Sequence, residues 1–181
     1  MKKVLRIVAI SVGIVFVVYL VLCFMGPAEF KVTRAISIQQ SPDQVKSLVT
    51  DFSQWRQWSA WSKRDTNMTG VFTGTPHQIG HHWEWKSESE GDGSQEIVGM
   101  TDDSVRMELK FAGFDKPNYG IWKFAAEGDG TKASWTMDGG AIAFPFRGMV
   151  YLFIGNLEED FEQGLSNLKS YAEKNSTETL P

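Results

Sequence analysis

The stretch Asp51-Phe-Ser-Gln-Trp-Arg-Gln-Trp-Ser-Ala-Trp-Ser62 places three tryptophans, Trp55, Trp58 and Trp61, within seven residues. Tryptophan has the largest apolar side chain, and its indole N–H needs a hydrogen-bond partner when it is buried. Three indoles at one helix end therefore need a large concavity to pack into. They indicate a rigid corner of the core, the mouth of an apolar cavity, or both at once.

A short helix is predicted immediately before this stretch. Ser41-Pro42-Asp43-Gln44 combines a capping serine, a proline at the first helical position and a glutamine three residues after the cap. We predict a helix from Pro42 to about Asp51, and a second short helix within the tryptophan stretch. Upstream, the alternating residues from Phe30 to Ile38 predict a strand.

Six further strands and one long helix are predicted downstream. The strands span residues 68–74, 80–87, 94–101, 104–111, 119–127 and 131–138, with glycine-containing turns at Glu90–Gly93 and Glu127–Gly130. Within them, bulky apolar residues alternate with charged ones, which is typical of an antiparallel sheet with one buried face. Apolar residues at three- or four-residue steps predict a helix from Phe146 to Lys174, which would cover that face.

The N-terminus carries a predicted membrane span. Ile7 to Met25 are 19 residues without a charge, and as a helix they would extend about 28 Å, close to the ~30 Å of a bilayer core. A cleaved signal peptide is the competing interpretation, but its apolar region is usually about 7–15 residues long. Gly26-Pro27-Ala28 is a poor cleavage site, and no small residue precedes Cys23 as a lipoprotein signal requires. We therefore predict an uncleaved single-pass anchor.

Charge predicts the orientation of the anchor and excludes some partners. Lys2, Lys3 and Arg6 precede the span, so the positive-inside rule places the N-terminus in the cytoplasm and the main domain outside. Removing these three from the 18 basic residues leaves 15 against 22 acidic ones, a net charge of −7 for the domain. An acidic domain of this kind is a poor binder of nucleic acid or of anionic lipid headgroups.

Few residues in the sequence suggest catalysis. The single cysteine, Cys23, excludes an intrachain disulfide and a cysteine-based zinc site. Of the three histidines, His77, His81 and His82, only His81 shares the inward parity of Trp83 and Trp85 in the predicted strand 80–87. His81 and His82 point in opposite directions, so we predict no metal site, no cofactor and no catalytic set, although His81 remains a candidate general acid or base. Arg34 either anchors a polar ligand group or is a surface charge.

Several segments together resemble a known family, the START-like helix-grip fold of the SRPBCC superfamily. The segments are Phe30–Ile38 with Ser41-Pro42, Asp51-Phe52 with the three tryptophans, Ser59 and Ser62, then Gly130-Thr131 with Trp135–Met137, and Asp160–Lys169. Within the superfamily, the chain is similar over residues 28–172 to membrane-anchored bacterial proteins of the polyketide cyclase/dehydrase type. The resemblance implies an α+β fold in which a curved antiparallel sheet wraps around the long C-terminal helix, and a location in the bacterial inner membrane.

The resemblance also implies a deep cavity between the sheet and the helix, often occupied by an apolar ligand. We expect the cavity to be lined by large inward-facing side chains: Trp58, Trp61, His81, Trp83, Trp85, Met107, Phe111, Trp122, Trp135, Met149 and Phe153. The expected organisation is an anchor over residues 1–27, a helix-grip domain over 28–174 and a polar, frayed tail over 175–181.

Three functions remain open from the sequence. The first is a membrane-tethered domain that binds an apolar small molecule or lipid. The second is a cyclase or dehydratase that acts on a polyketide-like compound, and the third is a scaffold that docks a membrane protein. The first is favoured, because a shaped apolar interior is visible in the sequence and a catalytic set is not.

Overall fold

The computed structural model describes residues 1–177, apart from the side chains of residues 152, 153 and 175–177. In chain order the elements are α1 (Lys2–Met25), β1 (Glu29–Ile38), α2 (Pro42–Thr50), η1 (Phe52–Gln54), α3 (Trp55–Trp58), α4 (Ala60–Arg64), β2 (Thr69–Thr73), β3 (His82–Lys86), β4 (Gly93–Met100), β5 (Ser104–Phe111), β6 (Asn118–Glu127), β7 (Gly130–Ala141), η2 (Phe144–Phe146) and α5 (Arg147–Thr177). Every predicted strand is present, with bounds that differ by at most three residues.

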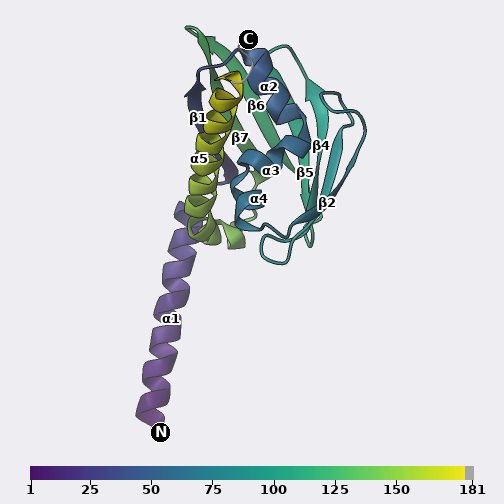
Figure 1. Cartoon of the computed structure of the whole chain (residues 1–181). Coiled ribbons are helices and arrows are strands. Elements are labelled where there is room, and N and C mark those ends of the chain that lie inside the picture. Colours follow the sequence, from purple (N-terminus) through teal and green to yellow (C-terminus); the bar gives the residue numbers. More distant parts are fainter. Residues whose placement is uncertain (178–181) are drawn as a thin grey trace.

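The strands form one antiparallel sheet in the order β1-β7-β6-β5-β4-β3-β2. The sheet curves, and α5 lies with α2, α3 and α4 on one side of it (Figure 1). The predicted α+β fold, a curved antiparallel sheet covered by the long C-terminal helix, is confirmed.

Two regions differ in detail from the predictions. The tryptophan stretch contains three short helical segments and not one, because two side chains restart the helix. Asp51 accepts a hydrogen bond from the backbone N–H of Ser53 (3.0 Å) at the start of η1, and Ser59 accepts one from that of Ser62 (3.4 Å) at the start of α4. At the other end of the chain, α5 continues to Thr177, into the predicted tail, and residues 178–181 of that tail lie outside the described residues.

An aromatic cluster joins the tryptophan stretch, the sheet and α5. The indole rings of Trp58 on α3 and Trp122 on β6 meet edge to face, with centroids 5.9 Å apart. Trp122 stacks on Trp135 of β7 at 4.6 Å, and Trp135 stacks in turn on Phe161 of α5 at 4.0 Å. All four side chains are buried. Burying large aromatic rings together in this way stabilises the domain.

The close approach of α5 to the sheet depends on a glycine. A Cβ on Gly164 would lie 3.2 Å from Cζ3 of Trp135, so with a larger residue the indole or the helix would have to shift by a few tenths of an ångström. On the outer side of the helix, Arg34 of β1 bridges Glu158 and Glu162 of α5, each at 2.7 Å. Arg34 is therefore a clamp between strand and helix, and it does not contribute to the cavity wall.

Helix α1 is the one helix among residues 1–177 that is long and apolar enough to cross a membrane. It protrudes from the domain next to the start of α5 (Figure 1). Its last turns pack against the domain: Cys23 is fully buried, and its Sγ would lie 3.1 Å from a Cβ on Gly148 of α5. The hydroxyl of Tyr151 donates to the carbonyl of Met25 at 3.0 Å. The end of α1 is thus part of the folded domain.

We predict that Gly93→Ala destabilises the domain by about 1–3 kcal/mol. A Cβ at Gly93 would lie 2.5 Å from Cζ2 of Trp85 and 2.7 Å from the carbonyl oxygen of Lys110, so the indole or the strand must move. Gly99→Ala on the same strand is the matched control, because its Cβ would meet nothing closer than 3.7 Å. Urea unfolding followed by tryptophan fluorescence measures both, and equal stabilities would contradict the prediction.

Candidate functional site

A cavity of about 210 Å³ lies between the tryptophan stretch, the concave face of the sheet and α5. Most of its wall is aromatic or aliphatic, and four polar residues interrupt it. The lining residues are Trp55, Ser59, Trp61, Ser62, Met68, Trp83, Trp85, Glu90, Gln95, Leu109, Phe111, Trp135, Met137 and Leu157. A concave apolar site with a few polar groups is the usual form of a small-molecule binding site.

The cavity lies toward the end of the domain that carries α1. Strand β1 starts at that end, directly after α1, so in an antiparallel sheet β7 ends there, β6 starts there and β5 ends there. By the same alternation the β3–β4 turn, which contains Glu90, is at that end. Leu157 is in the first half of α5, the half that α1 contacts. Figure 1 shows α4 and this turn at the α1 end of the domain.

The structure divides the predicted lining residues into two groups. Trp61, Trp83, Trp85, Phe111 and Trp135 are on the cavity wall. The others are elsewhere or are not described: Trp58, Met107, Trp122 and His81 are buried in packed parts of the core, Met149 is 40% exposed at the start of α5, and the side chain of Phe153 lies outside the described residues. Parity along a strand identifies the buried face correctly, but it does not tell which positions on that face adjoin empty space.

Several wall residues were not predicted. Leu109 and Met137 have the inward parity of their strands, and Gln95 shares the parity of Ile97 on β4, so the alternation already contained a signal for these three. No hydrophobic pattern in the sequence predicts that Ser59 and Ser62 are on the cavity wall. They line the cavity because α4 restarts at Ser59 and turns its first residues toward the sheet.

His81 has a structural role in the fold. Its imidazole is 2% exposed and stacks on Phe52 at 4.7 Å. Nε2 accepts a hydrogen bond from the backbone N–H of Phe52 (3.3 Å), and Nδ1 lies 3.1 Å from the carbonyl oxygen of Thr73, to which it donates. Both ring nitrogens of the neutral form are therefore engaged, and burial lowers the pKa of His81 below its ordinary value. This arrangement does not suit a general acid or base that faces the cavity.

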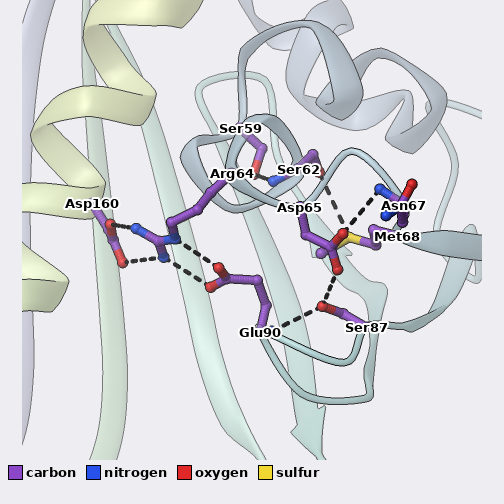
Figure 2. A network of polar contacts seen from close by, with 9 residues as sticks. All are labelled: Ser59, Ser62, Arg64, Asp65, Asn67, Met68, Ser87, Glu90 and Asp160. Carbon is purple, nitrogen blue, oxygen red and sulfur yellow. Dashed lines mark hydrogen bonds and ion pairs between the residues drawn. The ribbon is translucent and has the colours of Figure 1, made fainter.

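An ion-pair network adjoins the cavity at Glu90. Arg64 at the end of α4 binds Glu90 through Nε and Nη2, at 2.6 and 2.8 Å, and Asp160 of α5 through Nη1 and Nη2, at 2.7 and 3.1 Å. Figure 2 shows the guanidinium between the two carboxylates. Hydrogen bonds from Glu90 and Asp160 raise the pKa of Arg64 above its usual range. Glu90 lines the cavity, whereas the Arg64 side chain is half exposed. The network therefore lies between the cavity and the solvent.

A second set of contacts holds the same turn (Figure 2). The hydroxyl of Ser87 accepts a hydrogen bond from the backbone N–H of Glu90 (2.9 Å) and donates to Oδ2 of Asp65, just after α4. The hydrogen bond from Ser87 lowers the pKa of Asp65. The indole N–H of Trp85 donates to the carbonyl of Gly91 at 3.0 Å. The β3–β4 turn is thus attached to both α4 and the cavity wall.

Comparison with known proteins identifies the family. Residues 29–173 match the family described as polyketide cyclase/dehydrase and lipid transport proteins, which covers nearly all of the chain beyond α1. The chain belongs to this family. The predicted membership of the polyketide cyclase/dehydrase branch of the SRPBCC superfamily is confirmed.

Solved structures show the same fold at low sequence identity. Protein CV1439 from Chromobacterium violaceum is 14% identical, with a TM-score of 0.57 over 79% of this chain and 96% of that one. The Aha1 dimer from Colwellia psychrerythraea is 12% identical, with a TM-score of 0.60 over 80% and 96%. The di-domain ARO/CYC protein StfQ from the steffimycin biosynthetic pathway is 11% identical, with a TM-score of 0.59 over 83% of this chain and 52% of StfQ. At these identities the likeness shows the fold alone.

Two further findings limit what can be inferred about the function from known proteins. No curated protein matches the sequence. Among the residues that the structure describes, no group of three or more His, Cys, Asp or Glu side chains is arranged to hold a metal ion. The function must therefore be argued from the cavity and its surroundings.

We predict that Arg64→Gln loosens the β3–β4 turn with little effect on global stability. A half-exposed ion pair contributes at most about 1 kcal/mol, so the free energy of unfolding should fall by no more than that. The loss leaves Glu90 and Asp160 to repel each other, and amide hydrogen exchange in residues 87–93 should become about twofold to fivefold faster. Arg34→Gln is the matched control, because it also removes two ion pairs of one arginine, but both of them join β1 to α5 and neither involves the β3–β4 turn. Equal exchange in both variants would contradict the prediction.

We also predict a pH dependence of stability that originates at His81. Its pKa is lower in the folded than in the unfolded state, so the unfolded chain binds a proton first as the pH falls. The free energy of unfolding should decrease from about pH 6.5, the ordinary histidine pKa, down through the lower folded pKa. Urea unfolding between pH 5 and 8 measures the slope, which His81→Gln should reduce. An unaltered slope in His81→Gln would disprove this origin.

Proposed function

We propose that the protein binds an apolar small molecule in the cavity, within a domain held at a membrane by α1. The observation that carries the proposal is the aromatic cavity at the α1 end of a family fold that serves both ligand chemistry and lipid transport. Trp61, Trp83 and Trp85 give the wall flat apolar surfaces, which favour a ligand with little exposed polarity.

The junction between α1 and the domain supports a retained anchor. Cys23 is fully buried, and Tyr151 binds the last carbonyl of the helix. Cleavage after the apolar segment would remove these contacts and expose Gly148 and its surroundings. Together with the basic residues before the span, they favour a single-pass protein of the bacterial inner membrane, with its N-terminus in the cytoplasm and its domain outside.

Ligand binding fits the polar groups better than catalysis does. Glu90 has both carboxylate oxygens on Arg64, and His81 is occupied by Phe52 and Thr73 away from the cavity. Among the residues that the structure describes, the cavity wall contains no histidine, cysteine, lysine or aspartate. A cyclase or dehydratase needs a group that can move a proton at the substrate, and the engaged Glu90 is the one titratable side chain among these wall residues.

The proposal predicts that filling the cavity abolishes binding. Leu157→Trp places an indole into the cavity from α5, whereas Asn156→Trp adds the same side chain at the neighbouring exposed position. Full-length protein purified in detergent from its own membrane should carry an apolar molecule that native mass spectrometry detects. Its occupancy should fall about tenfold or more in Leu157→Trp and stay unchanged in Asn156→Trp.

The control on folding is the unfolding transition of each variant. If Leu157→Trp unfolds cooperatively and retains the molecule at full occupancy, the molecule is not in the cavity. If the unmodified protein carries no molecule and takes up none from a panel of apolar compounds, the proposed function is wrong.

A further inference from the structure

An exposed apolar patch lies where α1 meets the domain. It consists of Phe144 and Phe146 of η2 and Met149 of α5, and these three residues are the junction patch. Nine large apolar side chains are exposed in the described part of the chain after α1. Five of them are at this end of the domain: the junction patch, Tyr151 of α5 and Phe114 of the β5–β6 turn. Apolar surface gathered at one end of a protein marks a contact with another molecule or a membrane.

The chain around the junction patch lacks acidic residues. From Gly139 to Leu157 the one charged residue is Arg147, although the chain has 22 acidic residues in all. Carboxylates are repelled by anionic headgroups, whereas an arginine reaches the headgroup level with its apolar stem still buried. Exposed aromatic residues with one cation and no anion are the composition of a bilayer interface.

The η2 turn packs beside α1 and not beyond its end. The ring of Phe144 meets that of Phe24 edge to face, with centroids 4.8 Å apart. The carbonyl oxygen of Pro145 accepts a hydrogen bond from the hydroxyl of Tyr19 and lies 3.7 Å from Sγ of Cys23. The turn therefore lies alongside residues 19–24 of α1, which are its last turns, next to the start of α5 (Figure 1).

The length of α1 determines how deep this contact would lie in a bilayer. The uncharged stretch Ile7–Met25 has 19 residues, about as many as a ~30 Å hydrocarbon core requires. If the core ended before Tyr19, only residues 7–18 would span it, and 12 residues extend about 18 Å. A spanning α1 therefore keeps Tyr19 within the membrane. Six residues separate Tyr19 from Met25, so η2 reaches about 9 Å back along the helix, a depth typical of interfacial segments.

We propose that the junction patch is a second membrane contact, in which η2 and the first turn of α5 insert into the leaflet beside α1. The inference rests on the membrane anchor of the proposed function and adds the surface through which the domain lies on the bilayer. Arg147 is then at the headgroup level, because its main chain adjoins Gly26 at the end of α1. Two neighbouring contacts fix the tilt of the domain, so its cavity end faces the membrane.

The test measures whether lipid touches the junction patch in the full-length protein. Phe146→Cys, combined with Cys23→Ala to leave one thiol, carries an NBD fluorophore in phosphatidylcholine nanodiscs that hold one protein copy each. At a depth of 5–10 Å, the fluorophore should lose about half or more of its emission when the lipid carries a 5-doxyl quencher. Urea unfolding of the labelled variant checks its fold. If it does not unfold cooperatively, Met149→Cys takes the label instead.

Two further label positions serve as controls. Ile79→Cys is the matched control, because Ile79 is 64% exposed against 59% for Phe146 and the β2–β3 loop is at the opposite end of the domain. Its emission should be the same with and without doxyl lipid. Val15→Cys, in the middle of α1, should be quenched if α1 spans the bilayer.

The outcomes separate this inference from the proposed function. Quenching at position 15 but not at 146 overturns the second contact and leaves the anchor. No quenching at position 15 overturns the anchor and this inference with it. If the emission at 146 changes only in discs that hold two copies, and doxyl lipid has no effect, the patch is an interface between copies and the lipid contact is wrong. The occupancy of the cavity is measured separately, so none of these results decides ligand binding.

Discussion

The stacking of Phe161 of α5 on Trp135 of β7, at 4.0 Å and 12° between ring planes, is the contact on which the domain depends. It is possible because Gly164, one turn further along α5, lets the helix approach the sheet closely. Trp122 and Trp58 extend the same aromatic packing into the sheet and α3. Toward α1, helix and sheet leave a cavity of about 210 Å³ between them.

That cavity stays open because two large side chains lie along the sheet and do not project across it. A Cβ on Gly70 or Gly93 would overlap the indoles of Trp83 and Trp85, so glycine at these cross-strand positions lets both rings lie flat over a neighbouring strand. The same rings directed inward would fill the space. The sheet therefore uses its largest residues as walls, and the volume they leave is bounded by aromatic faces.

Hydrophobic alternation and capping residues were sufficient to predict the strands, the two main helices and the α+β fold, because these patterns express which face is buried. They were insufficient for the cavity. Trp122 and Trp85 have the same inward parity, yet Trp122 is in the packed core and Trp85 is on the cavity wall. Whether an inward-facing residue is packed depends on where α5 crosses the sheet, and strand parity does not show this. His81 has the right parity too, but the nearby backbone of Phe52 and Thr73 uses its nitrogens. Met149 belongs to the part of α5 near α1, beyond the core.

The buried aromatic cluster and the exposed ion pairs beside the cavity differ in how much they stabilise the structure. The aromatic cluster is buried and resists opening, whereas Arg64 is half exposed and its ion pairs to Glu90 and Asp160 contribute little in high dielectric. The ion pairs that hold the β3–β4 turn therefore contribute less to stability than the packing of α5 against the sheet. On the proposed function this matters because the β3–β4 turn is at the α1 end of the domain. An apolar ligand that partitions into the bilayer would then have to pass only this turn to reach the cavity. The domain itself is acidic, so on this proposal it stays at the membrane through the burial of α1 and not through charge.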